Sequence, residues 1–273
     1  MTQKLLLIVG PTAVGKTALS IELAKKYNGE IISGDSMQVY RHLDIGTAKV
    51  TPAEMQGIKH YLLDECEVDE RFSVAVFIEK CQQAIAKIAQ KQKLPIIVGG
   101  TGFYLQALLD NFGLGQDVYD ATEKIRKKWQ AYEALYGQQA LWDELNKIDP
   151  LAAQKIPPAN KRRVIRALEV IENTGKLFSQ QADQKNNAFS PFLIGLNTQR
   201  DLLYERINQR VDMMLEQGLL AEAKFLYQKG GLALPAGKGI GYKEFYPYFE
   251  KQASLAECVI EAKKNSRHYA KDN

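Results

Sequence analysis

The feature that most constrains the fold is a glycine-rich loop near the start of the chain. Residues 10–17 read Gly-Pro-Thr-Ala-Val-Gly-Lys-Thr and fit the pattern G-x-x-x-x-G-K-[ST]. The aliphatic run Lys4–Gly10 precedes this loop, and the amphipathic stretch Lys16–Tyr27 follows it. Strand, glycine loop and helix in this order predict the first βα unit of an α/β fold in which backbone amides bind phosphate groups.

The remaining pattern predicts a parallel sheet. Glu30–Ser33, Leu94–Val98 and Phe192–Leu196 are short aliphatic runs, whereas Phe72–Gln92 and Asp201–Gln217 have helical spacing. Strands that alternate with helices favour a parallel sheet covered on both faces. The predicted fold class is therefore α/β, a P-loop NTPase-like parallel sheet flanked by helices.

Residues 117–188 show helical spacing only, and we predict them to be an all-helical insertion domain in a catalytic core formed by 1–116 and 189–273. Four apolar residues are expected to share one helix face there: Trp129, Tyr132, Leu135 and Tyr136. The stretch from Lys155 to Lys176 holds six basic and two acidic residues, a net +4 that equals the charge of the whole chain.

Composition excludes several classes of protein. With 45% hydrophobic and 25% charged residues over 273 positions, the chain matches an ordinary globular protein. The apolar run Leu5–Val9 is far shorter than the roughly 20 residues that cross a bilayer, so no membrane partner is expected. Three cysteines without C-x-x-C spacing argue against zinc and disulfides and favour a cytoplasmic location. His42 and His60 lack metal-ligand spacing.

The loop itself supplies a predicted diphosphate site. Its candidate ligands are Gly10, Pro11, Thr12, Ala13, Val14, Gly15, Lys16 and Thr17. Successive amides form an anion cradle, Lys16 adds a positive charge, and the Thr17 hydroxyl is a candidate magnesium ligand. The motif leaves the reaction open, because a phosphate cradle serves several chemistries.

Two further strand ends carry polar residues. Asp35 follows the run Glu30–Ser33, at the sheet edge where ligands bind, and is either a general base, a magnesium partner or a turn aspartate. The run Leu94–Val98 ends in Gly99-Gly100-Thr101-Gly102 and not in an aspartate, which disfavours a motor-type ATPase. Thr101 offers a hydroxyl to a leaving oxygen, and a plain β-turn is the alternative.

Arginines occur in two helical stretches. Arg206 and Arg210 lie on one face of the predicted helix 201–217, where they either clamp a phosphate or pair with Glu205 or Asp212. The predicted helix Lys161–Asn173 has a core stripe of Val164, Ile165, Leu168 and Ile171, with Arg162, Arg163 and Arg166 turned elsewhere. These three arginines suit a phosphodiester backbone, and a solvated basic face is the alternative.

The motifs together resemble one family. They are residues 10–17, Asp35-Ser-Met-Gln-Val-Tyr40, Asp44-Ile-Gly-Thr-Ala-Lys49, Val98-Gly-Gly-Thr-Gly102, Arg162-Arg-Val-Ile-Arg-Ala-Leu-Glu169, Leu203-Tyr-Glu-Arg-Ile-Asn-Gln-Arg210 and Gly239-Ile-Gly-Tyr-Lys243. In these motifs the chain resembles the tRNA dimethylallyltransferases, the bacterial tRNA isopentenyltransferases, from residue 5 to about residue 270.

The resemblance implies transfer of a dimethylallyl group from dimethylallyl diphosphate to the exocyclic amine of the adenosine 3′-adjacent to the tRNA anticodon, with Mg²⁺. It implies that Asp35 takes the amine proton and that Thr101 and Arg210 stabilise the leaving diphosphate. The implied tRNA contacts are Asp35, Ser36, Met37, Gln38, Thr101, Arg162, Arg163, Val164, Ile165, Arg166, Gly239, Gly241, Tyr242 and Lys243. A monomer is expected.

The chain departs from the family pattern in two places. Pro157-Pro158-Ala159-Asn160 stands where His-Pro-Asn is usual, and the family's basic Lys-Arg-Gln stretch and aromatic helix are not among the 273 residues, so part of the tail is expected to be missing. Two other functions stay open from the residues: a small-molecule kinase with 117–188 as a lid, and a non-catalytic RNA-binding protein.

Overall fold

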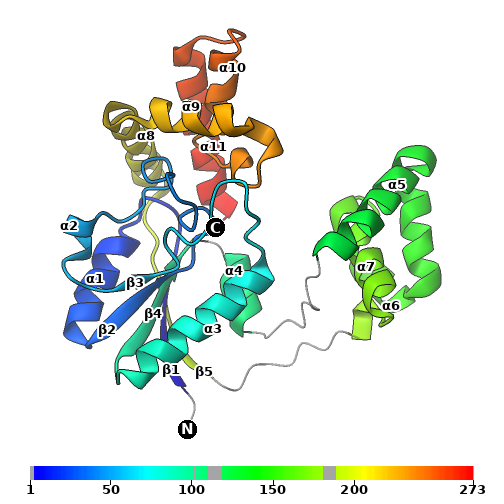
Figure 1. The fold of residues 1–273 in the computed structure, drawn as a ribbon, viewed down its shortest axis with the longest axis horizontal. Helices are drawn as coiled ribbons and strands as arrows, with labels where there is room; N and C mark the ends of the chain where they lie inside the picture. Colours follow the sequence, from blue (N-terminus) through cyan, green and yellow to red (C-terminus); the bar gives the residue numbers. More distant parts are fainter. Residues whose placement is uncertain (1–2, 101, 110–118, 181–188, 273) are drawn as a thin grey trace. The chain divides into compact units, whose positions relative to one another are not determined.

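The computed structural model describes residues 3–100, 102–109, 119–180 and 189–272 (Figure 1). The chain divides into two compact units, one formed by Met1–Ala107 with Asn187–Asn273 and the other by Leu108–Asn186. We refer to them as the α/β unit and the helical unit. The insertion limits that the sequence suggested, 117 and 188, lie outside the described residues, so those limits stay a prediction.

The α/β unit is built on a five-stranded sheet in the order β3-β2-β4-β1-β5, with every pairing parallel. The strands are β1 (Gln3–Val9), β2 (Gly29–Ser33), β3 (His60–Tyr61), β4 (Leu94–Gly99) and β5 (Phe189–Gly195). This arrangement confirms the predicted fold class. The β3 strand was not predicted, since two residues are too few to show a hydrophobic period.

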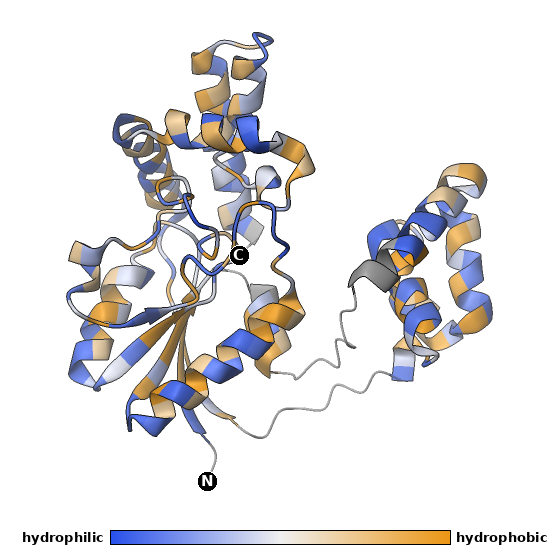
Figure 2. Cartoon of the chain, viewed as in Figure 1, coloured by the Kyte–Doolittle hydropathy of each residue, from blue (hydrophilic) through white to orange (hydrophobic). Residues whose placement is uncertain are grey.

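The central strands form because their side chains are apolar on both faces. In β1, Leu7 and Ile8 are fully buried, and in β4 Ile96 and Ile97 are too. Ile97 is in register with both Leu7 and Ile32, which places β4 between β1 and β2. Figure 2 shows these strands as mostly apolar. Continuous apolar runs of this kind are typical of a parallel sheet covered on both sides.

The helices of the α/β unit include the three that the sequence predicted at 16–27, 72–92 and 201–217. The helices of this unit are α1 (Lys16–Lys26), α2 (Pro52–Met55), α3 (Val74–Gln90), α4 (Gly102–Leu109), α8 (Arg200–Gln217), α9 (Leu219–Lys229), α10 (Tyr246–Phe249) and α11 (Leu255–Asp272). Short 3₁₀ turns span Gly231–Ala233, Ala236–Lys238 and Lys243–Phe245. Leu203 and Ile207 of α8 pack on Ala270 of α11, and Ala13 of the glycine loop packs against this cluster. The packing brings α8 to the phosphate loop.

The helical unit has its own core. It contains α5 (Tyr119–Ile148), α6 (Pro150–Lys155), α7 (Lys161–Thr174) and a 3₁₀ turn, Phe178–Gln180. Trp129, Leu141, Val164 and Leu168 belong to one buried cluster. A stable core inside this unit is what an insertion needs in order to fold as a body of its own.

One prediction for the helical unit is confirmed only in part. Trp129, Tyr132, Leu135 and Tyr136 were expected on one helix face. The rings of Trp129 and Tyr132 are in contact, with centroids 5.7 Å apart, and so are those of Tyr132 and Tyr136, at 4.7 Å. Leu135 and Tyr136 are nevertheless 76% and 65% exposed, so this face is covered only at its Trp129 end. Gly137, with φ 85° and ψ 170°, kinks α5 after all four residues.

A buried carboxylate in the helical unit is paired with two arginines. The Glu169 carboxylate is fully buried on α7, and Arg126 of α5 pairs with it at 2.8 Å. Arg166 donates to the same carboxylate at 3.1 Å. Burial of a carboxylate is costly unless it is paired, so this cluster fixes α5 against α7. Among the helices that the structure describes, none is long and apolar enough to cross a membrane.

Candidate active site

The glycine loop after β1 has the backbone of an anion cradle. Gly10, Ala13 and Gly15 have φ values of 146°, 64° and 100°, and positive φ values of this kind occur in loops whose successive amides bind anions. A Cβ on Gly10 would lie 2.4 Å from the Leu196 carbonyl oxygen, so the close approach of the chain after β5 requires glycine. Gly15 brings no side chain to cap α1, so the first amides of the helix have no capping acceptor and are suited to binding an anion.

Lys16 lies over this loop. Its Nζ donates to the carbonyl oxygens of Gly10 at 2.8 Å and Pro11 at 2.7 Å. Burial lowers the pKa of Lys16 to about 8, with Asp35 opposing this effect and Arg210 adding to it. Lys16 therefore lies within electrostatic reach of both Asp35 and Arg210.

Arg210 reaches the loop from α8. Its Nη1 donates to the Thr12 hydroxyl at 3.1 Å, and burial lowers its pKa. Arg206, one turn earlier, is exposed. The alternative was that these arginines pair with Glu205 or Asp212. Instead, Asp212 pairs with Lys263 at 2.6 Å, and Glu205 accepts a hydrogen bond from Gln209. The structure thus brings Arg210, and not Arg206, to the phosphate loop.

Asp35 follows β2 at the carboxyl edge of the sheet. Its Oδ1 accepts the backbone amides of Met37 at 2.7 Å and Gln38 at 3.3 Å. Burial raises the pKa of Asp35, although these two amides and Lys16 oppose the shift. The geometry is that of a turn aspartate, and the raised pKa is that of a candidate base. The turn aspartate is therefore observed, whereas the general base and the magnesium partner stay predictions.

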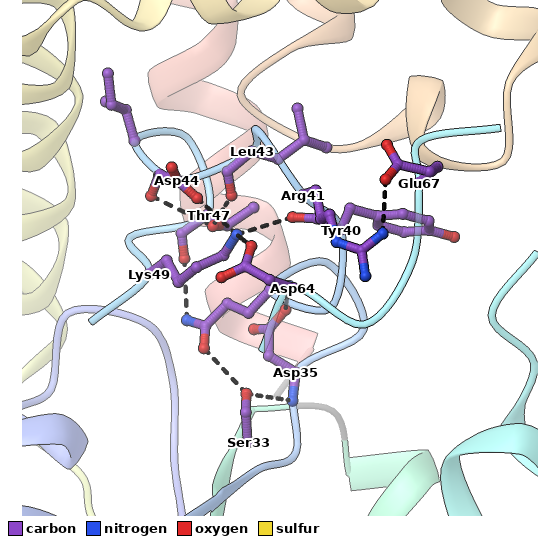
Figure 3. A network of polar contacts seen from close by, with 12 residues as sticks. Ser33, Asp35, Tyr40, Arg41, Leu43, Asp44, Thr47, Lys49, Asp64 and Glu67 are labelled. Carbon is purple, nitrogen blue, oxygen red and sulfur yellow. Dashed lines mark hydrogen bonds and ion pairs between the residues drawn. The ribbon is translucent and has the colours of Figure 1, made fainter. Parts of the chain in front are cut away.

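The loop after Asp35 is held by a polar network (Figure 3). Lys49, whose side chain is only 5% exposed, donates to the Tyr40 carbonyl oxygen and to Asp44 and Asp64. The two ion pairs are both 2.6 Å. A buried ammonium with three acceptors fixes the path of residues 40–49 beside Asp35. We call residues 44–49 the acceptor loop.

Two of the predicted RNA-contact segments meet here. A Cβ on Gly239 would lie 2.5 Å from Met37 Cε, so the segment Gly239–Lys243 packs against the segment Asp35–Gln38. Tyr242 is buried, Gly241 and Lys243 are half-buried, and Ser36 is half-buried beside Asp35. The structure therefore assembles these segments next to the candidate base.

The other predicted residues have different outcomes. Thr101 lies outside the described residues, so its role stays a prediction. In the helical unit, Arg162 and Arg163 are exposed on α7, as an RNA contact requires. Val164 and Ile165 are 0% and 7% exposed in the core of that unit, so their side chains cannot contact RNA. The predicted side-chain contact of this segment is therefore restricted to its arginines.

Sequence reasoning missed Glu222 of α9. Its carboxylate accepts backbone amides of the acceptor loop and the hydroxyl of Tyr242. Nothing in the local sequence distinguishes it from the other charged residues of an amphipathic helix. Its partners lie up to 178 positions away, so only an alignment or a structure reveals them.

The parallel sheet and the glycine loop, with Lys16 and Arg210 on the loop and the half-buried Asp35 at the next strand end, define this as an α/β protein of P-loop-like fold with a candidate phosphate site. The family model described as IPP transferase matches residues 38–272. A tRNA dimethylallyltransferase from Ligilactobacillus salivarius is 64% identical over 99% of this chain and 89% of its own length. One from Limosilactobacillus reuteri is 58% identical over 98% and 87%.

Solved structures agree. The full-length tRNA isopentenylpyrophosphate transferase from Bacillus halodurans has a TM-score of 0.72 at 49% identity, covering 99% of this chain and 85% of the other. A eukaryotic dimethylallyltransferase acting on tRNA has a TM-score of 0.85 at 33% identity, covering 99% and 69%. The chain belongs to the IPP transferase family, which confirms the predicted resemblance and enzyme class, a transferase.

Proposed function

We propose that the chain transfers a dimethylallyl group from dimethylallyl diphosphate to the exocyclic amine of the adenosine 3′-adjacent to the anticodon in tRNA, and releases diphosphate. The observation that carries this proposal is the shared site of Lys16, Arg210 and Asp35. Two cations that can stabilise a leaving diphosphate lie in the same site as a carboxylate that can accept a proton from an amine. Family membership supports the choice of donor and acceptor.

The donor binds through the glycine loop. The amides of residues 10–17 and the ammonium of Lys16 hold the diphosphate, and Arg210 meets the negative charge that develops on the bridging oxygen. Thr101 is proposed to hydrogen-bond the same oxygen. An adenine amine is a weak nucleophile because its lone pair is delocalised into the ring. Stabilising the leaving group therefore supplies most of the barrier lowering.

The residues fit a bound Mg²⁺. Thr17 lies in the first turn of α1, directly after the glycine loop, and is exposed, so its hydroxyl is accessible to an ion. Mg²⁺ is usually held by one or two protein ligands together with substrate phosphates, which is what this site offers. When bound, the ion would neutralise part of the charge on the diphosphate.

The acceptor side moves one proton. As the bond between the amine nitrogen and C1 of the dimethylallyl group forms, the C1–oxygen bond breaks and its electron pair leaves with the diphosphate. The nitrogen then carries a positive charge until it loses a proton. Asp35 accepts that proton, and its raised pKa makes it a better base than an exposed aspartate.

The RNA contacts are proposed from both units. In the α/β unit they are Asp35–Gln38 and Gly239–Lys243, and in the helical unit the exposed Arg162 and Arg163 with Arg166. Such arginines contact phosphates without reading sequence. The target base must leave its stack to reach Asp35, as other base-modifying enzymes require.

We further propose that the enzyme works as a monomer in the cytoplasm. Cys66, Cys81 and Cys258 are all free and buried, which is compatible with a reducing compartment. Size-exclusion chromatography with light scattering, with and without tRNA, measures the oligomeric state.

The test is direct transfer. The protein is incubated with dimethylallyl diphosphate, Mg²⁺ and an unmodified tRNA that has adenosine at the target position. Diphosphate release and an RNA mass higher by one dimethylallyl group in place of a hydrogen are expected. The matched control is a tRNA with guanosine at that position, which should stay unmodified. A free adenine nucleotide tests whether the acceptor must be RNA.

Other outcomes identify other functions. Transfer of a γ-phosphate from ATP, without change to the five-carbon group, would indicate a kinase. RNA binding without either chemistry would indicate a binding protein. Either result overturns the proposal.

A further inference from the structure

Glu222 clamps the acceptor loop from a distant helix. One carboxylate oxygen accepts the amides of Asp44 at 2.9 Å and Ile45 at 3.0 Å, and the other accepts the amide of Gly46 at 3.0 Å. The Tyr242 hydroxyl donates to the second oxygen as well. Four donors nearly fill the hydrogen-bond capacity of one carboxylate, which a solvent-exposed residue on a helix surface would not need.

The clamp is rigid for steric reasons. A Cβ on Gly46 would lie 2.5 to 2.8 Å from atoms of the Tyr242 ring and hydroxyl, so loop and ring are in direct contact. Tyr242 is 1% exposed, and burial together with Glu222 raises its pKa, which keeps the hydroxyl protonated as a donor. Lys49 fixes the other end of the same loop through Asp44 and Asp64.

The clamped loop is bonded to Gln38. The Gln38 Nε2 donates to the carbonyl oxygens of Thr47 at 3.1 Å and Ala48 at 3.4 Å, and its Oε1 accepts from the Ser33 hydroxyl at 3.0 Å. The backbone amide of the same residue donates to Asp35. Gln38 therefore connects the acceptor loop to the candidate base, with both ends of its side chain engaged inside the protein.

We propose that Glu222 is a positioning residue for the transfer reaction: by holding residues 44–46 it fixes Gln38, and through Gln38 it fixes the Asp35 carboxylate that receives the amine proton. This inference rests on the proposed function. It also changes the role of Gln38, which acts by orienting Asp35 and not by using its side-chain amide to read the RNA base.

The phosphate loop, on the donor side, forms no hydrogen bond with Glu222 in the part of the chain that the structure describes, and can be compared with the acceptor side. The phosphate loop is held by its own backbone and by Lys16 and Arg210, whereas Glu222 contacts only the acceptor loop and Tyr242 among the residues for which the structure gives its bonds. Loss of the clamp should therefore slow transfer without weakening the donor complex. A general loss of folding would affect both.

The variant is Glu222→Gln, which keeps the shape but replaces one acceptor oxygen with an amino group that cannot accept an amide. We expect kcat at saturating tRNA and donor to fall about tenfold or more, as loss of a hydrogen bond to a charged group implies. The KM for dimethylallyl diphosphate should change less than about twofold, because the substitution removes none of the proposed contacts that bind the donor. The melting temperature is measured alongside.

Glu257→Gln is the matched control. Glu257 also accepts a backbone amide and a hydroxyl, both from Ser254, but it is exposed at the start of α11. Its kcat should equal that of the wild type. If Glu222→Gln does not fold, Tyr242→Phe removes only the hydroxyl donor and should lower kcat severalfold with the fold intact.

A double-mutant cycle separates positioning from simple destabilisation. If Glu222 acts through Gln38, the variant Glu222→Gln with Gln38→Ala should lose little more than the worse of the two single variants, since coupled residues are not additive. A double loss equal to the product of the single losses overturns the proposal. So does a Glu222→Gln enzyme with wild-type kcat.

The two proposals fail in different ways. A wild-type protein that transfers no dimethylallyl group refutes the proposed function, and the inference with it. An active wild type whose Glu222→Gln variant raises the donor KM and leaves kcat unchanged refutes the inference alone, because the clamp would then serve donor binding.

Discussion

The donor side and the acceptor side of the site are built in opposite ways. The phosphate loop is eight consecutive residues whose amides and lysine are the proposed diphosphate ligands, with Arg210 as one long-range addition. Asp35 instead depends on a relay through Gln38 and the acceptor loop to Glu222, which lies 178 positions beyond Asp44. The donor side is thus formed mainly by adjacent residues, whereas the acceptor side is formed by residues that lie far apart in the sequence.

This difference has a physical origin. A diphosphate is a compact anion that any set of aligned amides can bind, so a contiguous loop suffices. An acceptor amine must be placed within hydrogen-bond reach of a base and in line with the breaking bond, and small misplacements are expensive in rate. Rigid positioning needs support from several elements, and the acceptor side recruits it from β2, α9 and the turn that holds Tyr242.

The largest effect should come from Asp35→Ala. Removal of a general base typically costs about 10² to 10⁴ in rate, and kcat should fall accordingly while tRNA binding stays within a few fold. Single-turnover transfer and filter binding measure the two quantities. Weak RNA binding with normal chemistry at saturating tRNA would make Asp35 a docking residue and would erase the contrast between the two halves.

The same residue fixes the acid limit of the reaction. Because burial raises the pKa of Asp35 above its ordinary value of 3.8, the base gains its proton at a higher pH than an exposed aspartate. Transfer should therefore be lost as the pH falls, with a midpoint above 3.8. A pH profile of kcat that stays flat down to that value contradicts a base in this position.

Arg210→Ala tests the long-range part of the donor side. Loss of one preorganised donor to a developing charge costs about 10² to 10³ in kcat. Arg206→Ala is the matched control, because this residue lies one turn earlier on α8 and is exposed. Equal losses of kcat in the two variants would show that α8 acts through its overall positive charge and not through the position of the Arg210 guanidinium.

Sequence alone predicted the local half of this site and missed most of the assembled half. The loop motif between a strand and a helix identified Lys16 and Thr17, and the strand end identified Asp35. Glu222 has no such signal, since its importance lies in partners that only folding brings near. In the helical unit, spacing grouped Leu135 with Trp129, but spacing alone does not show which residues of a helix face are covered by other helices.

Gly46→Ala should give an intermediate effect on the acceptor side. The added methyl would meet the buried Tyr242 ring and force the acceptor loop away, at a cost of about 1 to 3 kcal/mol in stability. We expect kcat to fall about tenfold and donor KM to stay constant, as for loss of the clamp. Gly195→Ala, where an added Cβ meets nothing within 4 Å, is the control. Identical kinetics in both variants would exclude the contact with Tyr242 as a determinant.

The smallest effect is expected in the helical unit. Arg162→Gln with Arg163→Gln removes two exposed charges from α7, whereas Arg166 is engaged with Glu169 and its loss would also disturb the core. The tRNA KM should rise a few fold, and the slope of log affinity against log salt should flatten by about 0.9 for each duplex phosphate that the protein no longer neutralises. Lys87→Gln on α3, equally exposed, should leave the slope unchanged. An unchanged slope in the arginine variant would mean that this basic face is only solvated, and that RNA affinity is carried by the same α/β unit that carries the chemistry.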